Sequence, residues 1–450
     1  MFERSIFTIF NKWVEKKDRK PLVLRGARQV GKTTAVNIWA KKFDNYLYFN
    51  LELPEDRQIF EQDISFEELV ESIFFNKNIV KGKGTTLIFI DEIQHSPQAV
   101  TLLRYFYEKT PDLYIMAAGS LLETLIDRHI SFPVGRVEYR FMRPLSFFEY
   151  LKAIEENQAS ELLTSIPVPE YAHVRLMKLF NRYTLMGGMP EIVRVYKQKK
   201  DLTQLKSIYD SLITAYMDDV EKYASNPNRA KVLRHIIKNA FYEAGNRITF
   251  QGFGKSNYRS REISEAFTVL EKALLLHLIY PTTKVHLPAE PNQKKSPKLQ
   301  LLDTGLVAHF AGLQGELLQT TNLDQIFRGK IGEHVVGQEI LSSNTSALYR
   351  LSFWVREKKQ SNAEIDFVIP SKHGLIPVEV KAGSVGRLRS LHQFMNRTNH
   401  PYSIRIYKEK LSIDTIKTIS GKPFYLLNLP YYLSGRLYDY IEWFVDKVGK

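Results

Sequence analysis

Residues 26–33 read Gly-Ala-Arg-Gln-Val-Gly-Lys-Thr, and this stretch decides the fold of the first part of the chain. The apolar run 21–24 precedes it and an amphipathic stretch, 32–42, follows it, which predicts the order strand, loop, helix. In that order, the backbone N–H groups of the loop and the positive end of the helix dipole can surround a phosphate. The spacing of the glycines and the Lys-Thr pair is that of a phosphate-binding loop, or P-loop. We therefore expect a parallel α/β sheet that binds a nucleotide.

The residue types in this loop suit a magnesium nucleotide. Gly26 and Gly31 permit the close turn. Lys32 is expected to reach the β- and γ-phosphates, and the hydroxyl of Thr33 is expected to ligate Mg²⁺. The predicted nucleotide-binding residues are Gly26, Ala27, Arg28, Gln29, Val30, Gly31, Lys32, Thr33 and Thr34. The expected cofactors are therefore ATP and Mg²⁺.

A second apolar run, 86–90, ends in the acidic pair Asp91 and Glu92. A continuous apolar run is typical of a strand that is buried on both faces. Acids at the carboxyl end of such a strand face the ligand crevice of a parallel sheet. We expect Asp91 to hold Mg²⁺ through its water shell and Glu92 to polarise the attacking water. A glutamate beside the aspartate indicates hydrolysis of ATP as well as binding.

A third apolar run, 113–118, leads to Gly119 and Ser120. Ser120 is a candidate sensor that contacts the γ-phosphate or the attacking water. Its alternative role is to cap a helix that begins at Leu121, because serine favours the N-cap position. One side chain can serve both roles.

The composition narrows the class of protein. With 450 residues, the chain is long enough for several domains, since single cores rarely grow beyond about 250–300 residues. Its formal net charge of +14 favours polyanionic partners such as nucleic acid. The absence of cysteine excludes disulfides, thiolate metal sites and cysteine nucleophiles. The chain also contains no apolar run long enough for a membrane span, so we expect a soluble, cytoplasmic protein without a membrane partner.

The middle of the chain is predicted to be helical and then to form a winged helix. Helical spacing dominates 146–245, where the Gly-Gly-Met-Pro stretch 187–190 is a natural hinge. Residues 246–310 read as a short strand, two helices and a hairpin. Basic residues of this region are compatible with contacts to DNA phosphates, or they keep an exposed loop soluble. They are Arg259, Arg261, Lys284, Lys294, Lys295 and Lys298.

Near the carboxyl terminus, the two alternating stretches 363–370 and 375–381 flank a four-residue turn. A hairpin centred between residues 372 and 373 places Asp366 opposite Glu379, and Glu364 opposite Lys381, on one face. Two opposed acids repel, so a divalent cation such as Mg²⁺ or Mn²⁺, or the neighbouring Lys381, must offset their charge. The alternative is a surface hairpin with a Glu364–Lys381 salt bridge.

Jointly, these motifs resemble the prokaryotic AAA-type ATPases (AAA_14) with a carboxyl-terminal DUF4143 region of PD-(D/E)xK nuclease-like fold. The resemblance rests on residues 25–33, 90–94, 118–120, 135–136, 144–147 and 187–191. It implies that the Ser120 strand lies between the P-loop strand and the Asp91 strand. It also implies that Arg136 is an arginine finger, although an arginine-rich stretch is alternatively an acid-pairing surface. The nuclease residues that it implies are Glu333, Asp366, Glu379 and Lys381.

The predicted fold class is therefore multidomain α/β. The expected domains are a P-loop ATPase (1–145), a helical lid or linker (146–245), a winged helix (246–310) and a restriction-endonuclease-like α/β domain (311–450). Glu92, Ser120 and Arg136 are the catalytic candidates. Three functions stay open: an ATPase coupled to a carboxyl-terminal region that acts on DNA, an ATP-driven switch whose inactive nuclease-like domain binds a partner protein, and an ATP-gated metal-dependent DNA nuclease.

Overall fold

The computed structural model describes residues 2–120, 135–224, 226–314, 330–346, 348–357, 363–381 and 388–449. The chain divides into two compact units. Unit 1 comprises Met1–Arg143 with the short segments Lys272–Leu274 and Thr345–Leu348, and unit 2 comprises the rest. The end of unit 1 lies close to the predicted domain boundary at residue 145. The further division of 146–450 into three domains stays a prediction.

Unit 1 is built on a five-stranded sheet of order β2-β3-β4-β1-β5, in which every neighbouring pair is parallel. Its strands are β1 (Leu22–Arg25), β2 (Asn45–Asn50), β3 (Thr86–Asp91), β4 (Tyr114–Gly119) and β5 (Glu138–Phe141). Strand β4 lies between β1 and β3, as predicted. Because the strands are parallel, their carboxyl ends meet at one edge of the sheet, which is where parallel sheets bind ligands.

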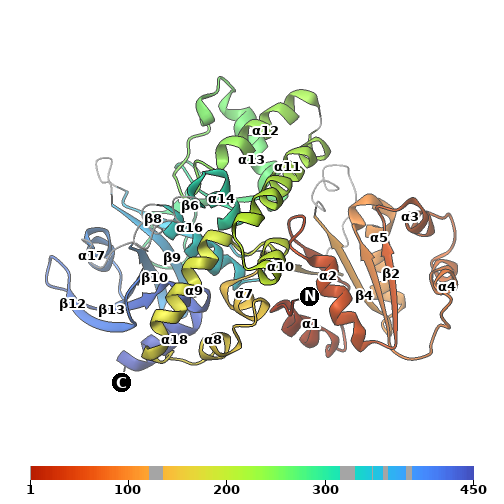
Figure 1. Ribbon diagram of the computed structural model, residues 1–450, viewed down its shortest axis with the longest axis horizontal. Coiled ribbons are helices and arrows are strands. Elements are labelled where there is room, and N and C mark those ends of the chain that lie inside the picture. The colour runs from red at the N-terminus through yellow and green to blue at the C-terminus, as the bar shows by residue number, and fades with distance from the viewer. Residues whose placement is uncertain are drawn as a thin grey trace. The chain divides into compact units, whose positions relative to one another are not determined.

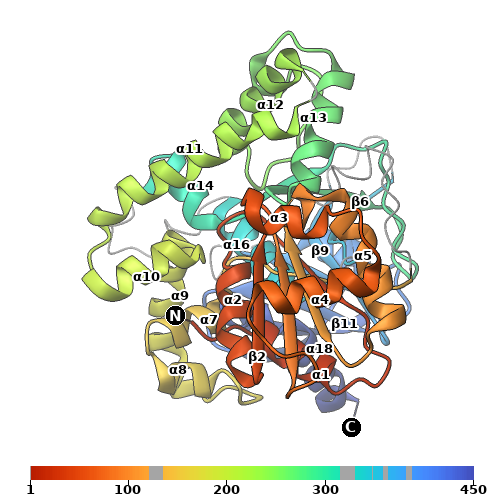
Figure 2. The ribbon, with the colours of Figure 1, turned by 90° about the vertical axis from the view of Figure 1, so that its right-hand side faces the viewer.

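Helices cover both faces of this sheet (Figures 1 and 2). On one face, α3 (Pro54–Phe60), α4 (Phe66–Asn76) and α5 (Pro97–Lys109) bury an apolar core with the strands. On the other face lie α1 (Ile6–Val14) and α2 (Lys32–Trp39), where the rings of Trp13 and Trp39 are 6.4 Å apart. Helix α2 begins at Lys32 as predicted, and the 3₁₀ turn η1 (Ala40–Lys42) completes the predicted stretch.

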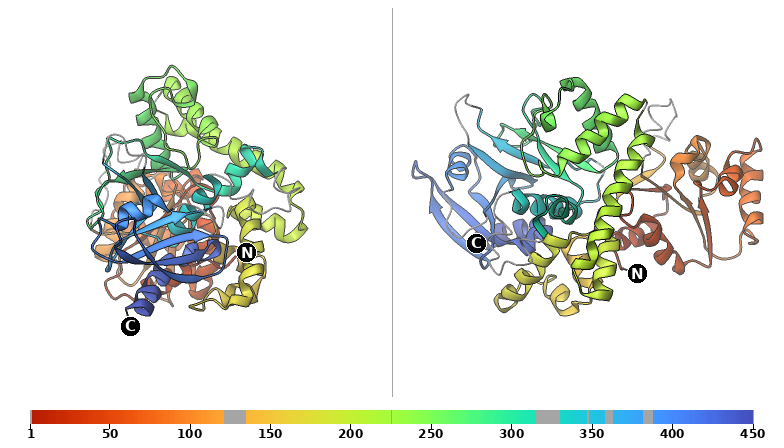
Figure 3. Two further views of the ribbon diagram at one scale, coloured as in Figure 1. Left: turned by 90° about the vertical axis from the view of Figure 1, so that its left-hand side faces the viewer. Right: turned by 45° about the horizontal axis from the view of Figure 1, so that its top comes forward.

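Unit 2 contains an eight-stranded mixed sheet of order β12-β13-β11-β10-β9-β8-β6-β7 (Figure 3). The strands are β6 (Leu276–Thr282), β7 (Lys298–Leu301), β8 (Ser352–Val355), β9 (Glu364–Ser371), β10 (Gly374–Val380), β11 (Tyr402–Tyr407), β12 (Ser412–Lys417) and β13 (Pro423–Pro430). The β9–β10 hairpin has the predicted register, because Ser371 lies opposite Gly374 and Phe367 lies opposite Val378.

The helices of unit 2 precede, interrupt and follow this sheet. They are α7 (Phe147–Ala153), α8 (Asn157–Leu162), α9 (His173–Met186), α10 (Pro190–Lys199), α11 (Lys206–Tyr223), α12 (Pro227–Ala240), α13 (Ser260–Lys272), α14 (Thr304–Phe310), α16 (Lys330–Ser342), α17 (Arg389–Met395) and α18 (Leu437–Val448). Helix α17 packs on the sheet through a core that includes Phe394 and Trp354, whose rings are 5.4 Å apart. None of the described helices has the length and apolar character that crossing a membrane requires.

Residues 246–310 were predicted to begin with a short strand, two helices and a hairpin; the structure has an isolated bridge, a 3₁₀ turn, one α-helix and the hairpin there. After α12, Arg247 forms an antiparallel bridge with Lys298. The 3₁₀ turn η5 (Phe253–Lys255) and α13 come next, and β6 then pairs antiparallel with β7. Strand β6 also pairs with β8, so the hairpin belongs to the same sheet as the carboxyl-terminal strands.

Candidate functional site

The loop between β1 and α2 lies at the carboxyl edge of the unit 1 sheet. Gln29 (φ 63°) and Gly31 (φ 91°) both adopt left-handed backbone conformations. Such residues let successive N–H groups of a loop converge on an anion. A Cβ atom on Gly26 would lie 2.4 Å from the carbonyl oxygen of Met142, so only glycine fits there. The sequence therefore folds into a loop shaped for phosphate.

Lys32 folds back over this loop. Its Nζ donates to the carbonyl oxygens of Gly26 at 2.9 Å and Ala27 at 3.0 Å. Burial lowers the pKa of Lys32, since its side chain is almost fully enclosed, although the charges of Glu92 and Asp91 oppose the effect. A phosphate would give this ammonium group the negative partner that carbonyl dipoles replace only in part.

Thr33 and Asp91 lie in direct contact. The Thr33 hydroxyl donates to Oδ2 of Asp91 at 2.6 Å, and the Tyr48 hydroxyl donates to the same oxygen at 3.3 Å. Burial raises the pKa of Asp91, while the hydrogen bond from Thr33 lowers it. A hydroxyl and a carboxylate are the oxygen ligands that Mg²⁺ prefers, so the residues present fit this ion.

Glu92 is fixed by its backbone and by a neighbour. It adopts a left-handed conformation (φ 49°), and its Oε2 accepts a hydrogen bond from Nε2 of Gln94. Gln94 belongs to the motif at 90–94, but its residue type alone did not suggest a role. The structure shows that it orients the predicted base.

Ser120 follows β4 at the same edge, and its side chain is buried. Among the described residues, its hydroxyl oxygen has no hydrogen-bond partner. The helix that Ser120 was predicted to cap lies outside the described residues. Both predicted roles, sensor and N-cap, therefore stay predictions.

The structure does not bring Arg136 to this edge. Arg136 precedes β5, which runs parallel to β1 with Glu138 opposite Leu22. It therefore lies at the amino edge of the sheet, whereas the P-loop lies at the carboxyl edge. Its guanidinium pairs with Glu108 on α5, which is the acid-pairing arrangement. This placement argues against a finger in the same chain, so the finger stays a prediction only for a neighbouring subunit.

Arg4 is a residue of this site that sequence reasoning missed. Its buried guanidinium donates to the carbonyl oxygens of Val30 in the loop, at 2.9 Å, and of Arg143, at 2.6 Å. It thereby ties the start of the chain to the P-loop and to the residue that ends unit 1. No local sequence pattern predicts this role, because the hydrogen-bond partners of Arg4 are 26 and 139 residues away in the sequence.

The residues predicted for a nuclease site gather in unit 2. Glu333 lies on α16, Asp366 on β9 and Glu379 on β10, and Lys381 follows β10. The backbone N–H of Val380 donates to Oδ2 of Asp366 at 2.8 Å. Lys381 Nζ lies 2.6 Å from Oε1 of Glu379. The structure thus brings all four predicted residues into one neighbourhood.

Lys298 lies among these acids, which corrects two sequence-based expectations. Its Nζ lies 2.8 Å from Glu364, 3.0 Å from Glu333 and 3.3 Å from Asp366. Lys298 was expected on an exposed basic loop, but it begins β7, and the pairing of β7 with β6 turns it inward; its exposed fraction is 5%. Glu364 was expected to pair with Lys381, but it pairs with Lys298 and with Arg247 at 3.5 Å.

Two acids of this cluster, Glu333 and Glu379, have a raised pKa. Burial, followed by the charge of Asp366, raises the pKa of Glu333 to about 7 and that of Glu379 to about 8. Burial alone would lower the pKa of Lys298, but the three carboxylates around it raise that pKa above its ordinary value. Within the described part of the chain, no group of three or more His, Cys, Asp or Glu side chains is arranged to hold a metal.

Family models match three segments of the chain. Residues 18–151 match AAA_14, described as an AAA domain, and residues 328–425 match a domain of unknown function, DUF4143. The chain carries an AAA_14 domain before a DUF4143 region. Between them, residues 177–317 match another domain of unknown function, DUF8612. No curated protein matches the chain.

Three solved structures that match the chain have low sequence identity to it. The Walker-type ATPase PABY2304 of Pyrococcus abyssi is 13% identical, covers 69% of this chain and 96% of its own, and has a TM-score of 0.45. PCH-2 of C. elegans is 12% identical over 43% of this chain and 58% of its own, with a TM-score of 0.27. A Drosophila ORC bound to DNA is 12% identical over 69% and 95%, with a TM-score of 0.26.

The Gly-Gly-Met-Pro stretch, which lies within the DUF8612 match, is tightly held. The N–H of Gly188 donates to Oδ2 of Asp303 at 2.6 Å, and its carbonyl accepts from the N–H of Leu145 at 2.7 Å. A Cβ atom on Gly188 would lie 2.0 Å from the carbonyl oxygen of Leu145. The glycine is therefore required by close packing, and these contacts do not support the predicted hinge.

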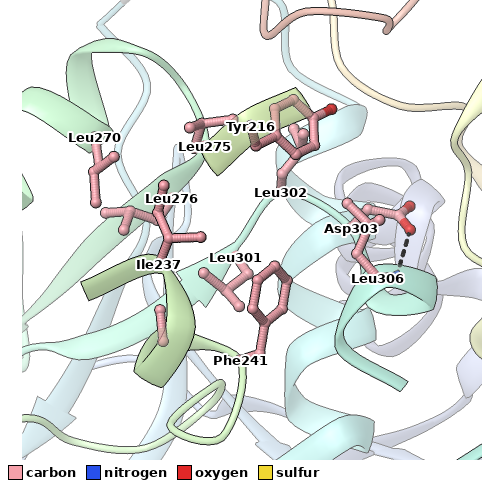
Figure 4. Close-up of a pocket in the computed structure, with 11 residues that line it drawn as sticks. Tyr216, Ile237, Phe241, Leu270, Leu275, Leu276, Leu301, Leu302, Asp303 and Leu306 are labelled. Atoms are coloured by element: carbon pink, nitrogen blue, oxygen red, sulfur yellow. Dashed lines mark hydrogen bonds between the residues drawn. The ribbon is translucent and has the colours of Figure 1, made fainter. Parts of the chain in front are cut away.

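The DUF8612 match also includes an apolar cavity of about 30 Å³ (Figure 4). Leucine side chains from several elements line it, and Asp303 closes one side, where its carboxylate accepts a hydrogen bond from the N–H of Leu306. Ligand pockets usually measure about 300–1,000 Å³. This cavity is far too small for a nucleotide, so we regard it as a packing defect.

Proposed function

We propose that the chain hydrolyses ATP with Mg²⁺ at the carboxyl edge of the unit 1 sheet. The observation that carries this proposal is the 2.6 Å hydrogen bond from the Thr33 hydroxyl to Asp91. It lies beside the P-loop, whose buried Lys32 can bind an anion. A magnesium nucleotide requires oxygen ligands for the metal ion and a cation for the phosphates. Both are present at the same sheet edge.

Each side chain then has one task. Lys32 leaves the loop carbonyls and binds the phosphates, and Thr33 and Asp91 hold the metal ion directly or through water. Mg²⁺, when bound, neutralises charge on the phosphates during transfer. Glu92, oriented by Gln94, accepts a proton from the attacking water. Lys32 and Asp91 are buried, which limits their solvation by bulk water and so strengthens their interactions.

Two substitutions test the site. Lys32→Ala should abolish binding of a fluorescent ATP analogue, while Glu92→Gln should bind the analogue and lose phosphate release. Lys41→Ala is a matched control, because Lys41 is an exposed lysine on the turn that follows the same helix. If Lys32→Ala binds ATP as well as wild type does, the proposed site is wrong. If Glu92→Gln hydrolyses ATP at an unchanged rate, Glu92 is not the catalytic base.

We infer that residues 227–301 form a winged helix that contacts DNA. The support is the order of α12, the Arg247–Lys298 bridge, α13 and the β6–β7 hairpin, which is the order of that fold. Arg259 and Arg261, at the start of α13, are exposed and could reach phosphates. A partner protein is the alternative occupant of this region.

Salt dependence separates these two partners. Phosphate contacts release counterions, so affinity for duplex DNA should fall steeply as salt rises. Substituting both Arg259 and Arg261 by alanine should weaken binding and flatten that dependence, whereas Arg397→Ala, at another exposed site of unit 2, should change neither. Absence of salt-dependent DNA binding by wild type would favour an ATP-driven switch that binds a partner protein.

A further inference from the structure

We propose that Lys298 supplies, from within the protein, the positive charge that a divalent metal supplies in nucleases of this motif. The carboxylate cluster of unit 2 therefore binds no metal and performs no metal-dependent cleavage. This inference goes beyond the proposed ATPase, and it does not depend on nucleotide binding or on the winged helix.

The first argument is the geometry around the ammonium group. Lys298 Nζ carries three N–H donors, and three carboxylates surround it at 2.8, 3.0 and 3.3 Å. A magnesium ion needs oxygen ligands at about 2.0–2.1 Å in near-octahedral geometry. The ammonium group stands where these oxygens converge, so a divalent ion could enter only by displacing a like charge.

The second argument is that other oxygens of these acids have partners within the protein, although Oε2 of Glu379 is buried and has no hydrogen-bond partner among the described residues. Asp366 Oδ2 accepts from the N–H of Val380 at 2.8 Å, and Glu379 Oε1 pairs with Lys381 at 2.6 Å. Arg247 lies 3.5 Å from the other carboxylate oxygen of Glu364, Oε2. The acids predicted to require a metal are thus compensated by cationic side chains.

The third argument is that secondary structure fixes the position of Lys298. It lies opposite Ile279 in the β6–β7 pair, and its backbone also bridges to Arg247. Its Nζ lies 5.1 Å from the centre of the Phe353 ring, a distance at which a cation and an aromatic face attract each other. Lys298 is therefore a component of a built site, unlike the mobile lysine of an exposed loop.

The test is binding of Mn²⁺, measured by the paramagnetic resonance signal of the free ion. The full chain is used without nucleotide and with Asp91→Asn, which removes the carboxylate of the ATP site. In this parent protein, we expect no Mn²⁺ binding that depends on Asp366. Adding Lys298→Ala should create one Mn²⁺ site per chain, and adding Asp366→Asn to that protein should abolish it. Lys294→Ala, on the exposed loop before β7, is the matched control and should create no site.

Two results would overturn the proposal. One is Mn²⁺ binding by the parent protein that Asp366→Asn removes, because the metal would then displace the lysine. The other is a folded Lys298→Ala variant that gains no Mn²⁺ site. The first comparison requires no lysine variant, so the proposal stays testable even if Lys298→Ala does not fold. Neither measurement involves ATP hydrolysis, so failure of the ATPase proposal would be seen separately.

Discussion

Glu339 is a buried carboxylate whose charge is unfavourable in the folded protein. Its exposed fraction is 2%, and its Oε1 accepts hydrogen bonds from the N–H of Phe147 at 3.0 Å and the hydroxyl of Tyr183 at 2.7 Å. Burial raises its pKa to about 7, more than these hydrogen bonds lower it. Glu339→Gln keeps an acceptor oxygen and removes the charge. We predict that it makes the stability of unit 2 less dependent on pH.

The direction and size follow from the pKa. A carboxylic acid with a raised pKa binds its proton more tightly in the folded state, so its contribution to stability is full below the pKa of the unfolded chain, 4.5, and is lost as the pH rises through about 7. Each pKa unit is worth about 1.4 kcal/mol. Wild type should therefore lose on the order of 3 kcal/mol of unfolding free energy between pH 4.5 and 8 that Glu339→Gln does not lose.

The assay is urea unfolding at several pH values, read by hydrogen exchange of peptides from α9 and α16, which report on unit 2 alone. Other titrating groups are the same in both proteins, so their effects cancel in the difference. Glu409→Gln is the matched control, because the Glu409 side chain is half exposed and its loss should not change the pH dependence. Parallel curves for wild type and Glu339→Gln would refute the argument from burial.

Three further substitutions test the sites. Gly188→Ala should destabilise unit 2 by about 3 kcal/mol or prevent its folding, because its new methyl group would collide with a carbonyl oxygen; thermal unfolding measures this. Gln94→Ala should retain nucleotide binding and lower the ATP turnover number by about tenfold to a hundredfold, because Glu92 loses the group that orients it. Arg136→Ala should leave the turnover of a dilute, monomeric protein unchanged. If turnover falls in an assembled form and mixing with Glu92→Gln restores it, the arginine acts from a neighbouring subunit.

The nucleotide half of the protein could be predicted because its signals are local. The P-loop places its glycines, lysine and threonine within eight residues, and Asp91 is the last residue of its strand. The order of strands then brings these two segments to one sheet edge. Arg4 and Tyr48 could not be found in this way, because their contacts join distant segments through a backbone carbonyl and a shared carboxylate.

The β9–β10 hairpin shows which contacts can be predicted from local sequence and which cannot. Its turn alone fixes the register, so the neighbourhood of Asp366 and Glu379 could be predicted. The partner of Glu364 could not be predicted, because Lys298 lies far from this hairpin in the sequence. It is 68 residues from Asp366. A lysine in a basic stretch is ordinarily solvated, and only the pairing of β7 with β6 turns this one inward.

This pairing also favours a binding role over cleavage for unit 2. Strand β7 forms one side of the hairpin in the proposed winged helix, and its first residue, Lys298, holds the acid cluster together. A movement that pulled β7 from the sheet would leave the partly buried Glu333 and Glu364 and the buried Asp366 without their shared cation, which is unfavourable. The β6–β7 hairpin is therefore held in place by acids that would bind the metal ion in a nuclease. Acids that are paired with Lys298 in this way are not free to hold a metal, which supports the proposed binding role over cleavage.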